Sequence, residues 1–229
     1  MNSSASTNRI TGGVTVTVNE AAGQQAVERA KALLTGIQGG AEKAMRAAMS
    51  RTVQRLRSGS NRAIQEKYDI SDASIRSEKN VRVSYSYQNG VQAVVTFSGR
   101  KLPLYRFGGA SPAVPTQDIA AGKKPVMVKG VWTRQYPGVA ARGHQFKDTK
   151  TTQFSDAFVA RMKSGHIGIF ERTGGSTSEG SDAIQELMGS SVAQMLGRQE
   201  VAQRLTEEAY QTFEKELDDA VYRILAGWR

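Results

Sequence analysis

The stretch VRVSYSYQNGVQAVVTF, from Val81 to Phe97, carries the strongest local structural signal in the chain. Apolar and polar residues alternate up to Tyr87, and the same alternation resumes at Val91. Between these runs, Asn89-Gly90 supplies residues that readily adopt the positive φ angles of a two-residue turn. The stretch therefore predicts a β-hairpin with one buried face, which the rest of the chain must cover.

A second alternating stretch, DAFVARMKSGHIGIFERTG, runs from Asp156 to Gly174. It predicts another hairpin, with a turn at Lys163-Ser164-Gly165 and a returning strand that begins at His166. His166 shares one face of that strand with Phe170. We interpret the His166 ring as half-buried and hydrogen-bonded to a backbone carbonyl beside the turn, because histidine has an intermediate tendency to burial.

Apolar residues recur at helical spacing in several other segments. These predict a helix from Ala21 to Ile37, and a basic helix from Lys43 to Lys67 that bends or ends at Gly59. The last helix, from Gln199 to Leu225, has an unbroken apolar stripe and an acidic outer face. Another helix is expected after Ser181, with an apolar face formed by Ile184, Leu187, Met188, Val192 and Met195.

Shorter elements complete the pattern. Strands are predicted at Gly13 to Asn19, where valines alternate with threonines, and at 126–133, while Ser71 is placed to cap a short helix. Residues 108–125 and 134–153 have no apolar periodicity and predict long extended loops. Long loops in a compact domain usually serve a function or become ordered on a partner.

Together these segments predict an α+β fold. We expect a small, mainly antiparallel sheet, made of the two hairpins and the strand at 126–133 and packed by long amphipathic helices. Residues 1–20 are predicted to form an N-terminal arm, and residues 21–229 a single domain from which the two loops extend.

Charge is distributed unevenly along the chain, whose formal net charge is +10. Residues 100–150 contain ten Lys or Arg and two acidic residues, whereas residues 151–229 contain eight and twelve. Such a division fits either a bound polyanion or complementary contacts between subunits, and exposed loop cations would attract DNA without reading its sequence. The predicted DNA-facing residues are Lys101, Arg106, Lys123, Lys124, Arg134, Arg142, Lys147 and Lys150.

The composition excludes several classes of chemistry. The chain has no cysteine, so disulfides and thiolate nucleophiles are excluded, and its two histidines, His144 and His166, lack the spacing of metal ligands. The glycine-rich ERTGGSTSEG lacks the lysine of a phosphate-binding loop and reads as a connector. We expect no catalysis, metal or cofactor; a weaker alternative is a hydrolase that uses His166 with Glu171 or Asp156.

The amino terminus is polar, and no window approaches the run of about 18 apolar residues that a membrane span needs. We therefore expect a soluble protein made in the cytoplasm.

Short motifs in the second half of the chain carry a family resemblance. Ala157-Phe158, Ser164-Gly165-His166, Gly168-Ile169-Phe170-Glu171-Arg172 and Glu186-Leu187-Met188-Gly189 follow one another in that order. In these motifs, and in its order of helices and hairpins, the chain resembles the phage minor tail protein Z family, a group of tail-completion proteins of tailed phages and prophages. The residues that match the family motif are Phe158, Gly165, His166, Gly168, Phe170, Arg172, Glu186, Leu187 and Gly189.

The resemblance implies a structural virion protein without catalysis. It would complete the head-proximal end of the tail and support head-tail joining, after assembly in the host cytoplasm. Its partners would be further copies in a hexameric ring, other tail or head-tail connector proteins, and double-stranded DNA in a basic lumen, with no membrane. The main alternative is a free-standing protein that binds double-stranded DNA without sequence specificity.

Overall fold

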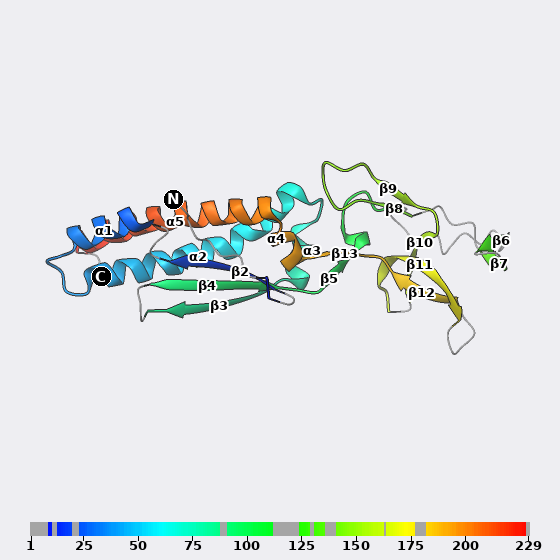
Figure 1. The fold of residues 1–229 in the computed structure, drawn as a ribbon, viewed down its shortest axis with the longest axis horizontal. Helices are drawn as coiled ribbons and strands as arrows, with labels where there is room; N and C mark the ends of the chain where they lie inside the picture. Colours follow the sequence, from blue (N-terminus) through cyan, green and yellow to red (C-terminus); the bar gives the residue numbers. More distant parts are fainter. Residues whose placement is uncertain are drawn as a thin grey trace. The chain divides into compact units, whose positions relative to one another are not determined.

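The computed structural model describes residues 9–10, 13–19, 23–87, 91–111, 124–128, 131–135, 141–162, 164–176 and 182–227 (Figure 1). The chain divides into two compact units. Unit 1 comprises Met1–Ile64, Ser77–Arg100 and Ser191–Arg229, and unit 2 comprises Gln65–Arg76 and Lys101–Ser190.

Unit 1 contains a four-stranded antiparallel sheet with the order β1-β2-β4-β3. The strands are β1 (Arg9–Ile10), β2 (Gly13–Asn19), β3 (Asn80–Ser86) and β4 (Gln92–Ser98). The hairpin predicted from the opening stretch is confirmed, since Val81 pairs with Phe97 and Tyr85 with Ala93. Its predicted turn at Asn89-Gly90 lies outside the described residues.

The valines of β2 explain why this strand joins the sheet. Val14 and Val16 lie opposite Phe97 and Val95 of β4, and all four side chains are buried on one face. On the other face, the hydroxyl groups of Thr15 and Thr96 are 3.4 Å apart. The strand predicted at 13–19 is thus confirmed, with its apolar and polar residues on opposite faces.

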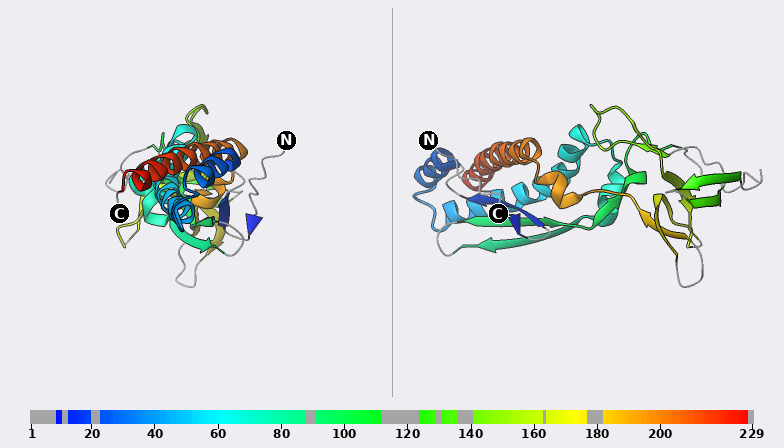
Figure 2. Two further views of the ribbon diagram at one scale, coloured as in Figure 1. Left: turned by 90° about the vertical axis from the view of Figure 1, so that its left-hand side faces the viewer. Right: turned by 45° about the vertical axis from the view of Figure 1, so that its right-hand side comes forward.

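Helices cover the apolar face of this sheet (Figures 1 and 2). They are α1 (Gln24–Leu33), α2 (Gly40–Lys67), the short α4 (Val192–Leu196) and α5 (Gln199–Leu225). The apolar stripe of α5 is buried, with Leu205, Phe213 and Leu217 at most 1% exposed. The predicted last helix is confirmed, whereas α2 continues through Gly59 rather than ending there.

Unit 2 is built from short antiparallel pairs. Its main sheet has the order β10-β11-β12, from β10 (Ala157–Arg161), β11 (Ile167–Ser176) and β12 (Asp182–Glu186). The second predicted hairpin is confirmed in β10 and β11, and Gly165 in its turn has φ +84°. The other strands are β5 (Lys101–Pro103), β6 (Lys124–Val128), β7 (Val131–Gln135), β8 (Ala141–Gly143), β9 (Thr152–Phe154) and β13 (Met188–Ser191), with a 3-10 turn η2 (Leu104–Arg106) after β5.

The short helix α3 (Asp72–Glu78) begins where the sequence predicted a cap. The Ser71 hydroxyl accepts a hydrogen bond from the Ser74 backbone N–H at 3.2 Å. This satisfies one of the amides that the first turn of a helix leaves unpaired.

The α+β class and the packing of long helices on antiparallel sheet are confirmed. However, the two hairpins belong to separate sheets rather than one, because each buries its apolar face within its own unit. The single strand predicted at 126–133 is instead a hairpin of β6 and β7, in which Val126 pairs with Thr133. The loop predicted at 134–153 also contains β8 and the first residues of β9.

The helix predicted after Ser181 is wrong. Residues 182–191 form β12 and β13, and the helix in this region, α4, begins only at Val192. The apolar spacing that suggested a longer helix is equally compatible with strands, and pairing of β12 with β11 decides between them. Ser191 starts α4 with a capping box, in which its hydroxyl and the Gln194 side chain each accept a backbone N–H.

We predict that Phe213→Ala destabilises the protein by about 3–5 kcal/mol, because it removes a fully buried aromatic ring from the stripe of α5. Tyr222→Ala on the same helix is the matched control, since Tyr222 is 74% exposed. Urea denaturation followed by circular dichroism measures both free energies of unfolding. Equal losses from the two variants would contradict the assigned packing of α5.

Candidate nucleic-acid interface

The described cations predicted to face DNA lie in unit 2, on its short strands and the connections between them. Lys101 begins β5 and is exposed, whereas Arg106 in η2 is half-buried. Arg142, Lys147 and Lys150 are exposed within residues 141–150. Lys123 lies outside the described residues, as do the side chains of Lys124 in β6 and Arg134 in β7.

Residues 141–150, which we call the basic segment, are anchored to the chain just after α2. The Asp69 N–H donates to the Gln145 carbonyl at 2.9 Å, and the Lys147 N–H donates to the Lys67 carbonyl at 3.1 Å. The rings of Tyr68 and Phe146 pack between these bonds, with 4.8 Å between their centroids. The backbone of the basic segment is therefore held in place, which lowers the entropy that its cations would lose on binding.

His144 fixes the same segment through its side chain. Its Nε2 lies 2.9 Å from Asp69 Oδ2, and its Nδ1 lies 3.0 Å from Thr151 Oγ1. The imidazole is only 13% exposed. With both ring nitrogens engaged, His144 ties the basic segment to Asp69. This role of His144 could not be predicted from the sequence, because its carboxylate partner lies 75 residues away.

Gly108 and Gly109 make room for this cluster. A Cβ at Gly108 would collide with the Asp69 carboxylate, and one at Gly109 would collide with the His144 ring. Gly109 also has φ +67°, a conformation that L side chains rarely adopt. Although hydroxyl, imidazole and carboxylate are the groups of a hydrolytic triad, here they join three segments of chain, and we assign the cluster a structural role.

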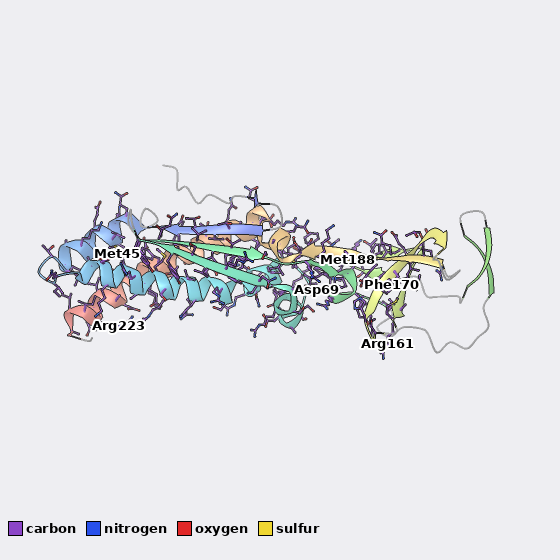
Figure 3. All side chains as sticks on the ribbon, turned by 90° about the horizontal axis from the view of Figure 1, so that it is seen from below. Met45, Asp69, Arg161, Phe170, Met188 and Arg223 are labelled. Atoms are coloured by element: carbon purple, nitrogen blue, oxygen red, sulfur yellow. The ribbon has the colours of Figure 1, made fainter. Side chains whose placement is uncertain are left out.

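The residues of the family motif gather on β11 and its neighbours. His166 Nε2 lies 2.7 Å from Glu186 Oε1, so the predicted bond from its ring to a backbone carbonyl is replaced by a carboxylate partner. The His166 ring meets Phe170 edge-on, with 6.4 Å between centroids. Figure 3 labels Phe170 on β11 and Met188 on β13. A Cβ at Gly168 would collide with the Glu186 carboxylate, which explains the glycine between the two aromatic rings.

The other motif residues also serve packing. The Arg172 guanidinium lies 4.5 Å from the centroid of the Phe158 ring. The Leu187 N–H donates to the Ile169 carbonyl at 2.8 Å, and a Cβ at Gly189 would collide with the Phe107 ring. These contacts assign the motif to the core and edges of unit 2 rather than to chemistry.

The geometry does not favour the hydrolase that the sequence left open. Glu171 points to the face of β11 opposite His166, because side chains alternate along a strand. Asp156 accepts a hydrogen bond from Ser155 instead. The carboxylate beside His166 is Glu186, 20 residues away in the sequence, rather than either of the two predicted partners.

Part of the positive charge of the basic helix α2 is neutralised by acidic residues of the same chain. Arg51 forms an ion pair with Glu216 of α5 at 3.0 Å, and Arg46 pairs with Glu42 one turn away. Arg46 also stacks on the Tyr87 ring at 4.2 Å from its centroid. Part of the acidic face of α5 thus serves an internal contact.

Among the described residues, no group of three or more His, Cys, Asp or Glu could hold a metal ion. Within the same residues, no helix combines the length and apolar character that crossing a membrane requires.

Comparison with protein families gave one informative result. The family described as Prophage minor tail protein Z (GPZ) matches residues 24–226, nearly the whole chain. This match confirms the resemblance indicated by the motifs of β10 to β13. Comparisons with curated proteins and with solved structures gave no match.

We predict that His144→Ala loosens the basic segment, because the variant loses the hydrogen bonds to Asp69 and Thr151. Amide hydrogen exchange at residues 145–151 should accelerate by about tenfold, equivalent to about 1.4 kcal/mol of local stability. Thr149→Ala, an exposed change in the same segment, should leave exchange unchanged. Equal protection in His144→Ala and the parent protein would show that the cluster does not anchor the segment.

We also predict that Gly168→Ala destabilises unit 2 by about 1–3 kcal/mol, because the added methyl group competes with the Glu186 carboxylate. Glu186→Ala should cost less in the Gly168→Ala background than alone. Thermal unfolding of the two single variants and the double variant measures this coupling. Strictly additive losses would mean that the two positions are independent.

Proposed function

Because the chain belongs to the prophage minor tail protein Z family, we propose that it completes the head-proximal end of a phage tail and supports head-tail joining as a hexameric ring. The chain is a phage minor tail protein, a structural component of the virion, and this is consistent with a protein that is not an enzyme. The family match over residues 24–226 carries the proposal. The proposal includes assembly in the host cytoplasm and contact with neighbouring tail or connector proteins.

The basic segment supports the proposed lumen for double-stranded DNA. Arg142, Lys147 and Lys150 are exposed on a backbone held by Asp69 and His144. Cations fixed on a rigid segment attract phosphates without reading bases, as a passage for any genome sequence requires. Lys101, at the start of β5, is also exposed, and we assign it to the same proposed surface.

A ring also needs surfaces through which subunits meet. A closed ring is built from heterologous contacts, in which one surface of each subunit meets a different surface of the next. The division between basic and acidic parts of the chain supports such contacts, since complementary charges favour one orientation and suppress others.

The proposed function is tested by reversing Lys123, Lys124 and Lys147 to glutamate. We expect tails of normal length, because these residues are proposed to face DNA rather than other subunits, but DNA retention or ejection reduced by at least about tenfold, since repulsive charges replace attractive ones. Electron microscopy counts tails, and DNA protection from nuclease measures retention. A control with equal charge change, Lys43→Glu, Arg57→Glu and Lys215→Glu, should retain DNA normally.

The outcomes distinguish the main alternative. If DNA retention and ejection are normal in the variant with Lys123, Lys124 and Lys147 reversed, these residues do not line a passage for DNA. A free-standing DNA-binding protein would be favoured instead by three results together. The protein would bind duplex DNA tightly and in a salt-sensitive way, stay monomeric at all concentrations, and be missing from purified tails.

A further inference from the structure

Two arginines of α2 flank a groove along α5. The groove has a volume of about 260 Å³, and its lining includes the small residues Gly59 and Ala209 beside Leu56 and Leu205. Arg55 and Arg62 line it and are exposed. Within the part of the chain that the structure describes, neither guanidinium forms a hydrogen bond or ion pair. Both are free to bind an anionic group.

The groove's own carboxylate does not neutralise these arginines. Glu208 of α5 lines the groove, but its Oε1 accepts a hydrogen bond from Arg204 at 3.1 Å, one turn away on the same helix. Gly59 leaves space beside Glu208, since a Cβ there would lie 3.5 Å from its Oε2. With two arginines and one glutamate in its lining, the groove therefore presents a surplus of positive charge.

A matching pair of acids lies elsewhere on α5. Glu207 and Glu214 are exposed and, among the described residues, form no hydrogen bond or ion pair. They are seven residues apart, as are Arg55 and Arg62. Seven residues make two helical turns and a rise of about 10 Å, so each pair forms a row along one face of its helix.

The two rows of one chain point in different directions. The α2 side of α5 is marked by Glu216, paired with Arg51, and by Thr212, which lines the groove. The α1 side is marked by Asp218, whose carboxylate pairs with Arg29 at 3.1 Å.

The acid row lies on the α1 side. A Cβ on Gly23, the residue before α1, would lie 3.4 Å from Glu214 Cγ. At about 100° per residue, Glu207 projects within about 20° of Glu214 and about 140° from Thr212, whereas Gln211 at the edge of the groove lies between them. Among the described residues, neither Glu207 nor Glu214 pairs with Arg55 or Arg62 of the same chain.

We propose that α5 of a second copy seats Glu207 and Glu214 against Arg55 and Arg62 of the first. Arginine and carboxylate form strong charge-assisted hydrogen bonds, and Arg rather than Lys at both positions suits this geometry. In a ring, the basic row of each copy meets the acid row of the next, so the contact is heterologous and leaves a free surface for a further copy. This inference rests on the ring of the proposed function and names the surfaces that form it.

Cysteine cross-linking tests the contact directly, because the chain contains no cysteine. We would pair Arg62→Cys with Glu207→Cys, and in a second variant with Glu214→Cys, to cover both relative directions of the helices. Mild oxidation of tails that carry either variant should give a ladder of dimers, trimers and larger products on denaturing gels. Arg57→Cys with Glu207→Cys is the control and should stay monomeric, because Arg57 lies on a different side of α2.

Charge reversal supplies a second readout. Arg55→Glu with Arg62→Glu should weaken self-association, measured by native mass spectrometry and sedimentation, by at least about tenfold. Glu207→Arg with Glu214→Arg should do the same, and the four changes together should restore association to within about threefold of the parent, which also shows that the variants fold. Lys43→Glu with Arg57→Glu is the control of equal charge and should associate normally.

Several results would overturn the pairing. Cross-linked dimers without larger products would mean a two-fold contact, and no cross-link from either cysteine pair would mean that the rows do not meet. Loss of duplex DNA binding in Arg55→Glu with Arg62→Glu, with association intact, would assign the groove to nucleic acid. If a ring still forms at the tail end in all charge-reversal variants, this pairing is wrong and the proposed function stands. If cross-linked ladders come from particles that carry the protein away from the tail end, the pairing stands and the proposed function is wrong.

Discussion

Burial of the apolar stripe of α5 is the interaction on which unit 1 depends. Leu205, Phe213 and Leu217 are almost completely enclosed, although α5 lies about a hundred residues after the sheet that it helps to cover. Ion pairs at the edges of this stripe, such as Arg51 of α2 with Glu216 of α5, each contribute little stability. They form where packing brings the two helices side by side. Because packing fixes which flank of α5 remains outside, it also decides which acidic side chains another molecule can reach.

Unit 2 depends on a different constraint, the close approach of side chains to glycines. The carboxylates of Asp69 and Glu186 and the ring of Phe107 each occupy the space where a Cβ of Gly108, Gly168 or Gly189 would stand. Few long elements are available here, so short strands are held by such contacts and by buried rings. The residues of the family motif therefore serve the packing of unit 2. Within that packing, His166 is the hydrogen-bond partner of Glu186.

The sequence was sufficient where structure follows from neighbouring residues. Alternation around Asn89-Gly90 predicted the first hairpin, and the stripe of the last helix predicted its bounds, because both patterns are local. It failed between 182 and 191, where the same apolar residues suit a helix or two strands and pairing with β11 and β5 decides. The partners of His144 and His166 could not be read from it either, since they lie 75 and 20 residues away and are brought close only by folding.

The contact between Gly168 and the Glu186 carboxylate has a consequence for the evolution of the family. A larger residue at position 168 requires the side chain at 186 to become shorter or to turn away, and either change would withdraw the carboxylate from the imidazole of His166. The three positions are therefore coupled through one carboxylate. Among homologous tail proteins they should vary together, and a lineage that lost the glycine should show compensating replacements at the other two.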